Sequence, residues 1–290
     1  MATFPIYELM ALTAAVCWGA NAVLVRHGMA TSNATSAALL SISGNAVVLT
    51  ALLFTTGASW PPFSAGYLFF VASGLLQPAI VRTITYWSYG RLGVARTQPI
   101  RSSTPLISVF LAILFLGEEP TVFTLLGTLA VIGGIIFISL EPPRTPKTWR
   151  SRDLAIPIAA TCLAGVSQLF RKLGLGFVPH PVLAAMVTIS TSWLATLCGT
   201  VLFGGRSKLR FPRRSLPYFL AGAAVTSLGQ VLSFHALRGG DLSMVSPLSN
   251  TTPLFAMVFS ALFLRQVEQV TWRVVLGAVT VVGGVGLILV

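Results

Sequence analysis

Two arginines stand inside long apolar runs of the sequence, where a charged side chain needs a partner or a water-filled cavity. Arg82 and Arg101 both occupy such positions. A guanidinium group there either captures a carboxylate through paired hydrogen bonds or extends to the lipid headgroups. Acidic residues are confined to the ends of the runs, at Glu8, Glu118, Glu119, Glu141, Asp153, Asp241 and Glu268. This distribution disfavours exchange of an organic cation for protons, which usually needs a carboxylate within the membrane.

Neutral polar and aromatic side chains form a second set in the same apolar runs. A polar group in hydrocarbon must find a partner, so we expect these side chains to turn inward. Each of them either contacts a substrate or forms a hydrogen bond between helices. Most gather in the first, third, fourth, sixth, eighth and ninth runs, which predicts a common cavity. With the two arginines, the predicted substrate-binding residues are Trp18, Asn21, Gln77, Arg82, Tyr86, Arg101, Gln168, Trp193, Gln230, His235, Asn250 and Thr251.

Residue patterns typical of catalysis or metal binding do not occur in the sequence. A catalytic site needs an acid, a base, a nucleophile or a metal brought together in a cavity. The sequence has no Gly-x-Ser-x-Gly turn, and His27, His180 and His235 are scattered along it. We therefore expect no catalytic residue, no metal and no cofactor, and we do not expect an enzyme.

One proline motif occurs twice. The pattern Pro-x-x-x-x-Thr-Pro-Leu covers residues 99–106 and again residues 247–254, an offset of 148. The second proline of each motif lies inside an apolar run and predicts a kink, whereas the first either kinks the helix or opens it at the first turn. The threonine before the second proline can cap the disturbed turn. The predicted hinge residues are Pro99, Pro105, Pro247 and Pro253.

Composition identifies the apolar runs as membrane spans. The chain is 54% hydrophobic and 9% charged, whereas a soluble domain carries about 25% charged residues. Apolar stretches of about 20 residues are the signature of transmembrane helices. The predicted spans are 6–26, 34–55, 66–89, 94–116, 121–140, 154–171, 181–203, 216–237, 242–264 and 271–290.

The net charge of +12 follows the connections between spans. In a soluble protein such a charge would suggest nucleic acid, but here no nucleic-acid partner is expected. Connections after odd-numbered spans carry 14 Lys and Arg residues, and the opposite side carries only Arg171, Lys172 and Arg238. Because Lys and Arg stay in the cytoplasm during insertion, both termini are predicted on the non-cytoplasmic side.

The two halves of the chain repeat each other. Matched glycines at residues 127, 133 and 134 recur at residues 277, 283 and 284, an offset of 150; they indicate close helix packing or, alternatively, a dimer face. Since each half has five spans, the second must run through the bilayer in the opposite sense. We predict an all-α integral membrane fold of ten transmembrane helices, with two inverted five-helix repeats around a central cavity. The expected units are an N-terminal repeat 1–142, a cytoplasmic linker 143–153 and a C-terminal repeat 154–290.

This five-plus-five arrangement resembles the drug/metabolite transporter superfamily, specifically its EamA-type members. The likeness is carried by Cys17-Trp18-Gly19-Ala20-Asn21, by the paired Thr-Pro-Leu motifs and by Leu116-Gly117-Glu118-Glu119. The corresponding Leu264-Arg-Gln-Val-Glu268 departs from the Gly-Glu pattern, which weakens any role assigned to that motif. Within the superfamily the chain looks most like bacterial exporters of amino acids, including the aromatic ones.

The resemblance implies a secondary transporter of the bacterial inner membrane that exports small metabolites, chiefly amino acids, by alternating access. Its expected partners are a small-molecule substrate and membrane lipid, and the working expectation is a monomer. Without an acid inside the membrane, the simplest scheme is facilitated efflux. The alternatives are an exporter of drugs or other metabolites in the same superfamily and, from other classes, a membrane-embedded enzyme or a channel.

Overall fold

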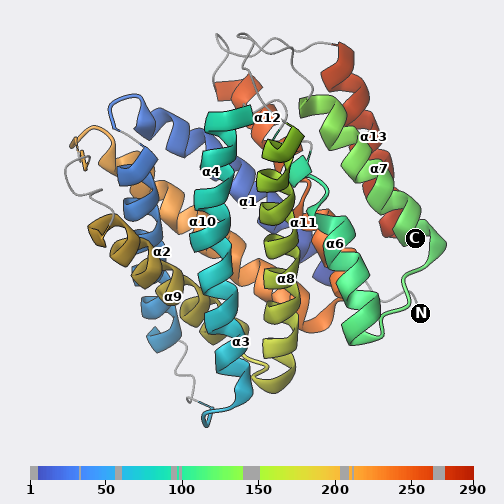
Figure 1. Ribbon diagram of the computed structural model, residues 1–290, viewed down its shortest axis with the longest axis horizontal. Helices are drawn as coiled ribbons and strands as arrows, with labels where there is room; N and C mark the ends of the chain where they lie inside the picture. The colour runs from blue at the N-terminus through green and yellow to red at the C-terminus, as the bar shows by residue number, and fades with distance from the viewer. Residues whose placement is uncertain are drawn as a thin grey trace.

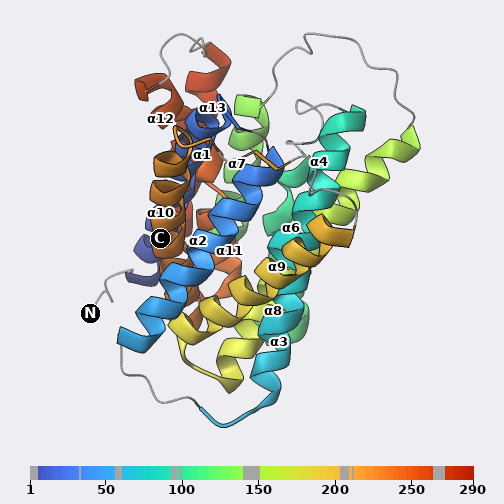
Figure 2. The same ribbon diagram turned by 90° about the vertical axis from the view of Figure 1, so that its left-hand side faces the viewer.

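The structure, a computed structural model, describes residues 6–32, 34–55, 61–92, 97, 100–139, 151–202, 209–210, 212–263 and 272–290. The described residues form helices joined by short turns, without a strand among them. Six helical segments in this part of the chain are long and apolar enough to cross a membrane, and three shorter helices are also apolar. Figures 1 and 2 show these helices gathered into one bundle.

Helices in the first half follow the predicted spans. They are α1 (Ile6–Met29), α2 (Ala34–Thr55), α3 (Ala65–Gly74) with the wide turn η1 (Leu75–Ile80) and α4 (Val81–Leu92), α6 (Thr104–Leu111) with η2 (Ala112–Leu116), and α7 (Val122–Ser139). The third span is broken, which the sequence analysis did not anticipate. Gln77 leaves the helical conformation (φ −138, ψ 124) before Pro78, a residue that cannot donate a backbone hydrogen bond and disfavours helix at its predecessor.

Helices in the second half repeat this order. They are η3 (Ser151–Leu154) with α8 (Ala155–Phe177), α9 (Pro181–Leu202), α10 (Leu216–Gly239), α11 (Leu242–Ser249) with α12 (Thr252–Phe263), and α13 (Trp272–Ile288). One predicted end was wrong: hydropathy ended the sixth span at Arg171, whereas α8 continues to Phe177. The charge of Arg171 lowers the local hydropathy, but its side chain is buried.

The predicted inversion of the halves is confirmed by the crossing of α7 and α13, which lie side by side in Figure 1. A Cβ atom added to Gly127 would stand 2.6 Å from the Gly284 carbonyl oxygen, and one on Gly277 would stand 2.7 Å from that of Gly134. The offset of 150 converts the first contact into the second. The symmetry that relates the two halves therefore maps this helix contact onto itself. Residue 127 meets residue 284 and residue 134 meets residue 277, so the two helices run antiparallel, as a two-fold axis in the membrane plane requires. The glycines are needed because they let the backbones approach this closely.

The same symmetry relates the contacts at the centre of the bundle. Helix α1 packs on α10, and its counterpart α8 packs on α3; α1 also contacts α12, as α8 contacts α6. Helices α2 and α9 pack against each other. The predicted arrangement of two five-helix repeats around a centre is thereby confirmed, with the interrupted spans on the inside.

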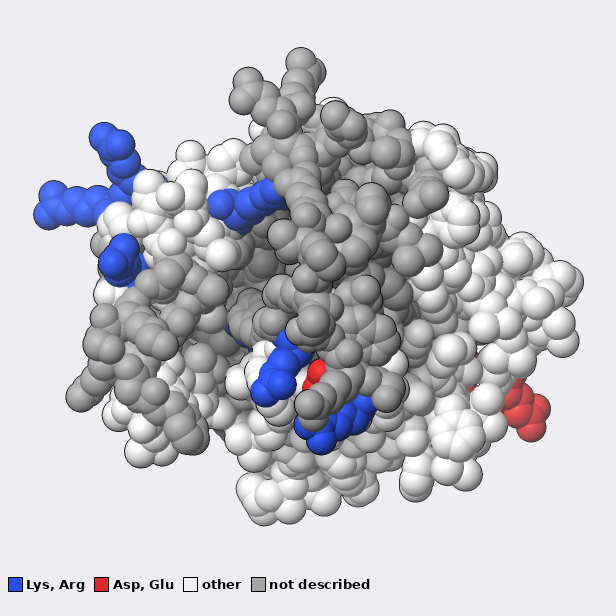
Figure 3. All heavy atoms as spheres, turned by 45° about the horizontal axis from the view of Figure 1, so that its top comes forward, with Lys and Arg blue, Asp and Glu red and all other residues white. Residues whose placement is uncertain are grey.

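Basic side chains gather at one end of the bundle. Figure 3 brings this end forward and shows Lys and Arg side chains over it, with few acidic ones in view. Helices α1 and α4 end there (Figures 1 and 2), and the exposed Arg213 and Arg214 lie in the turn that precedes α10. We refer to it as the basic face.

Candidate functional site

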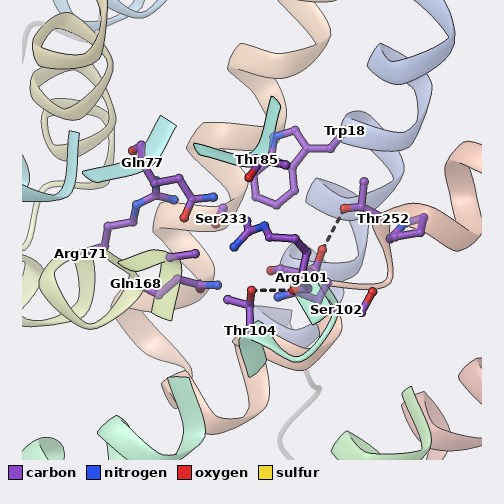
Figure 4. Close-up of a pocket in the computed structure, with 14 residues that line it drawn as sticks. Trp18, Gln77, Thr85, Arg101, Ser102, Thr104, Gln168, Arg171, Ser233 and Thr252 are labelled. Atoms are coloured by element: carbon purple, nitrogen blue, oxygen red, sulfur yellow. Dashed lines mark hydrogen bonds between the residues drawn. The ribbon is translucent and has the colours of Figure 1, made fainter. Parts of the chain in front are cut away.

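A cavity of about 360 Å³ lies between the two halves (Figure 4). Its walls come from α1, η1, α4 and α6 of the first half and from α8, α10, α11 and α12 of the second, with the turns that precede α6 and α12. The lining residues are Trp18, Gln77, Thr85, Arg101, Ser102, Thr104, Ala164, Gln168, Arg171, Ser233, Ser249, Asn250, Thr252 and Pro253.

The duplicated motif supplies equivalent walls from both halves. Residues 101, 102 and 104 line the cavity, and so do residues 249, 250 and 252, which stand 148 positions later. The Thr104 hydroxyl donates to the Arg101 carbonyl over 2.7 Å, and the Thr252 hydroxyl donates to the Ser249 carbonyl over 2.9 Å. Each threonine thus satisfies a carbonyl at the interrupted turn, as the sequence predicts.

Arg101 comes from the turn before α6 and reaches into the middle of the cavity (Figure 4). Its Nη1 atom donates to the Ala160 carbonyl oxygen of α8 over 2.7 Å. That contact fixes one edge of the guanidinium group against the opposite half of the protein. The arginine therefore bridges the two halves at the wall of the cavity.

Arg171 is the main site residue that sequence reasoning missed. It lies on α8, only 6% exposed, where its Nε donates to Ser73 Oγ over 3.0 Å and its Nη2 donates to the Gln77 carbonyl oxygen over 3.2 Å. Its guanidinium carbon stands 5.5 Å from the Phe234 ring centroid, a cation–π contact. The break at Gln77 frees a carbonyl in the third span, and Arg171 satisfies it. The signal that could have found Arg171 is the glycine-rich apolar stretch that continues to residue 177.

Hydroxyl groups support this break from three helices. Ser73 and Ser167 hydroxyls stand 2.9 Å apart, and the Ser192 hydroxyl donates to the Gly74 carbonyl over 2.6 Å. Gln168 Nε2 donates to Ser246 Oγ over 3.3 Å, which ties α8 to α11. Such pairing is what polar groups in a membrane require, and it holds the cavity wall in one arrangement.

Two buried oxygen atoms at the cavity have no hydrogen-bond partner within the described part of the chain. They are Gln77 Oε1 and Ser249 Oγ. A buried acceptor without a partner is costly. Trp18 adds a large aromatic ring to the same wall. The cavity thus offers two guanidinium groups, unsatisfied acceptors and an apolar face.

The electrostatic character of the cavity follows from its lining. Among the described residues it contains Arg101 and Arg171 and no acidic side chain. The acidic residues that the structure describes all lie at helix ends, at Glu8, Glu118, Glu119, Asp153 and Asp241. Coulomb attraction strengthens away from bulk water, so the cavity favours anions over cations.

Five of the predicted binding residues line the cavity: Trp18, Gln77, Arg101, Gln168 and Asn250. Substrate contact by these residues stays a prediction. The side chain of Tyr86 lies outside the described residues. The remaining predicted residues do not line the cavity: Asn21, Arg82, Trp193, Gln230, His235 and Thr251.

Those remaining side chains meet other helices or their own. Trp193 Nε1 donates to Ser43 Oγ over 2.9 Å, and Thr251 Oγ1 donates to the Leu248 carbonyl over 2.6 Å. His235 Nδ1 is 2.9 Å from the Val231 carbonyl oxygen. Asn21 faces Gly222 of α10. The contact of Trp193 is the hydrogen bond between helices that was the alternative to substrate binding, whereas the Thr251 hydroxyl bonds within its own turn.

Further from the cavity, Gln230 is buried on α10, and Arg82 is half-buried on α4.

The prolines interrupt the fourth and ninth spans in a way that differs from the expected kinks. Pro105 and Pro253 each stand in the first turn of a new helix, α6 and α12, just after the break. Proline is well tolerated there because its missing N–H is not needed. Pro247 lies within α11, and Pro99 lies outside the described residues. Hinge motion at these prolines stays a prediction.

Ten spans in two inverted halves around a polar central cavity define the architecture of a secondary transporter. The chain belongs to the EamA-like transporter family, whose sequence profile matches residues 5–140 and again residues 151–290. The resemblance to the drug/metabolite transporter superfamily is thereby confirmed.

Two curated relatives are similar to a segment of the chain, and one solved structure has a similar fold. A segment of 72 residues is 38% identical to the "Phosphoenolpyruvate/phosphate translocator 1, chloroplastic" of Oryza sativa subsp. japonica, covering 23% of this chain and 18% of that protein. The Arabidopsis thaliana protein of the same name is 33% identical over 73 residues, 24% of this chain and 18% of that protein. The chain thus spans less than a fifth of the length of these curated relatives. One crystal structure of a protein has a similar fold, with a TM-score of 0.80 and 15% sequence identity. The match covers 98% of this chain and 96% of the chain in that structure.

Proposed function

We propose that this protein is a secondary transporter that exports small metabolites bearing a carboxylate or another anionic group. The observation that carries the proposal is the pair of guanidinium groups, Arg101 and Arg171, on the wall of one cavity. A guanidinium group binds carboxylate and phosphate oxygens through charge-assisted hydrogen bonds. Because the described lining of the cavity contains no acidic side chain, a bound anion meets no negative charge among these residues.

Amino acids are the first candidate substrates. The carboxylate of an amino acid lies against the arginines in this proposal, and its ammonium group donates to Gln77 Oε1 and Ser249 Oγ, the buried acceptors without a described partner. The ring of Trp18 offers its apolar side chain a face to pack on. Each group of the zwitterion thereby has a complementary group on the wall.

Organic phosphates are the second candidates. Two relatives carry names that specify phosphoenolpyruvate and phosphate as their cargo. A pair of guanidinium groups also suits a dianion better than a zwitterion, because each formal negative charge gains its own partner. Other metabolites and drugs of the same superfamily are the remaining alternative.

The proposed mechanism is alternating access. The two inverted halves rock around the cavity, and the interrupted spans bend at the proline motifs. Facilitated efflux is the simplest scheme, since the described acids lie at helix ends. The basic face is cytoplasmic in this proposal, with both termini on the other side of a bacterial inner membrane. Neither catalysis nor a channel pore is part of it.

Counterflow in proteoliposomes tests the proposal. Vesicles carrying the purified protein are loaded with one unlabelled compound and mixed with a trace of the same compound in radiolabelled form. The panel contains apolar and aromatic amino acids, phosphoenolpyruvate, inorganic phosphate and an organic cation. Saturable accumulation of an amino acid or an organic phosphate supports the proposal and chooses between the candidates. Accumulation of the cation alone would contradict it.

Arg101 should determine apparent affinity for the anion. We expect Arg101→Gln to raise KM by about tenfold to a hundredfold, the loss of one charge-assisted hydrogen bond, and Arg101→Lys to restore part of it. The control is Arg213→Gln, which removes an exposed arginine of the basic face. Initial counterflow rates against substrate concentration give KM. An unchanged KM in Arg101→Gln would remove Arg101 from the binding site.

Two tryptophans distinguish the cavity from the surrounding hydrogen bonds. Trp18 lines the cavity, whereas Trp193 bonds to Ser43 on α2. We expect Trp18→Ala to raise KM by about tenfold, since the substrate loses an apolar surface worth about 1.5 kcal/mol, and Trp193→Ala to change KM by less than about twofold while lowering thermal stability. The two KM values are measured by the same counterflow assay. The opposite order would place the substrate near α2 and α9.

A further inference from the structure

The Leu116-Gly117-Glu118-Glu119 motif places a carboxylate of the first half on a helix of the second. Glu118 Oε1 accepts a hydrogen bond from the Leu242 backbone N–H, and Oε2 accepts one from the Ser243 N–H, each over 2.8 Å. These are the first two residues of α11. Gly117 makes the turn possible, because it adopts the left-handed conformation (φ +67) at the end of η2. Glu118 is thus a helix cap supplied across the boundary between the halves.

The start of α11 depends on this outside cap. Asp241 stands at the N-cap position in an extended conformation, and its side chain makes no capping hydrogen bond. Helix N-termini have unpaired N–H groups and favour negative charge. Glu118 satisfies both needs where the local sequence does not.

A second side chain, beside Glu118, also holds the start of α11. Lys172 of α8 donates from Nζ to the Gly240 carbonyl oxygen over 2.7 Å, and the charges of Glu118 and Asp241 act on its ammonium group. The segment from Gly240 to Ser243 is therefore held by a carboxylate from the first half and by an ammonium group from α8. Both contacts lie at the end of the bundle opposite the basic face, where the connections 117–121 and 240–241 lie.

Helix α11, which begins at this cap, reaches the cavity at its other end. Helix α11 packs on α6, α8 and η2, and Leu242, Val245 and Leu248 are at most 1% exposed. Its far end leads into Ser249 and Asn250, which line the cavity. At 1.5 Å per residue, its eight residues place the cap about 12 Å from those side chains. Helix α11 therefore connects the Glu118 cap to the wall of the cavity.

We propose that Glu118, with Lys172, is the latch that keeps the cavity closed at the end opposite the basic face. The latch must release α11 when the halves rock, so it extends the proposed transport cycle. Glu118 is a positioning residue in this proposal: it acts through α11 and does not touch substrate.

Access of a thiol reagent tests the latch without a substrate. The background chain carries Cys17→Ala, Cys162→Ala and Cys198→Ala, and Ser249→Cys places a reporter on the cavity wall. A membrane-impermeant maleimide is added to right-side-out and to inverted membrane vesicles, and the labelling rate is measured on each side. The labelling result does not depend on the counterflow panel, so failure of the proposed function would not decide it. Failure of the latch would likewise leave the counterflow test unaffected.

We expect Glu118→Ala to raise labelling from the side opposite the basic face by about fivefold to thirtyfold, the population change that matches loss of a helix cap, with no rise from the basic side. Glu118→Gln keeps one acceptor and should give a smaller rise in the same direction, as should Lys172→Met. The matched control is Glu119→Ala, an exposed neighbour.

Labelling of Glu118→Ala at the rate of Glu119→Ala would overturn the latch. An equal rise from both sides would also overturn it, because that outcome reports a loosened bundle. If Glu118→Ala does not reach the membrane, Glu118→Gln and Lys172→Met decide by the same two criteria.

Discussion

Replacing Arg171 by methionine is expected to lower both the transport rate and the thermal stability of the protein. The side chain keeps its length and apolar stem but loses the guanidinium group. The Gln77 carbonyl oxygen then loses the Arg171 donor at the break in the third span, and an unsatisfied buried acceptor costs about 1–3 kcal/mol. The substrate anion also loses one of its two cationic partners. We expect kcat/KM to fall by about tenfold to a hundredfold from the binding contribution alone.

The two effects separate in measurements on the same preparation. Thermal stability is measured as the temperature at which half of the monodisperse peak is lost after heating in detergent. Transport is measured as the counterflow rate per folded molecule. The control is Arg238→Met, which removes an exposed arginine from the last turn of α10 and should leave both within about 0.5 kcal/mol of the parent. Arg171→Lys keeps the charge but not the fork of donors, so it should retain more transport than stability. A fully stable and active Arg171→Met protein would show that neither role holds.

Local patterns in the sequence were sufficient to predict the fold. Hydropathy located the ten spans, because it depends on residues near one another in the chain. The glycine and proline motifs identified the two halves, because each motif recurs at a fixed offset, 150 or 148. The site residues that belong to such a motif were predicted. Arg101 and Asn250 belong to the duplicated motif, and both line the cavity.

Other site residues were not predicted, because their roles depend on contacts between helices. Arg171 looked like the end of a span, since hydropathy counts a charge and does not see the carbonyl that Gln77 frees. Trp193 and Asn21 are polar groups in apolar helices like the rest, but their helical faces turn toward α2 and α10. Glu118 belongs to a motif that is visible in the sequence, but its hydrogen-bond partners lie 124 and 125 residues away in the other half. Which face of a helix meets which neighbour is a property of the packed bundle.

The crossing of α7 and α13 gives a large expected loss of stability from one apolar substitution. We expect Gly134→Leu to lower the free energy of unfolding by about 3 kcal/mol, at the upper end of what overpacking costs. A Cβ atom at residue 134 would lie 2.6 Å from the carbonyl oxygen of Gly277, which is backbone and cannot rotate away. The helices must separate, and the reciprocal contact between residues 127 and 284 weakens with it. The readout is the thermal midpoint in detergent.

The adjacent glycine provides the matched control. Gly133 is exposed on α7, and no atom of the described structure lies within 4 Å of a Cβ atom added there. Gly133→Leu adds the same apolar volume one residue away and should stay within about 0.5 kcal/mol of the parent. Equal destabilisation by the two variants would mean that the outer face of α7 is itself packed, the dimer that the glycine repeat left as an alternative, and size-exclusion chromatography would then show a change of oligomeric state for Gly133→Leu. Loss of stability confined to Gly134→Leu assigns the repeated glycines to the contact between the two halves.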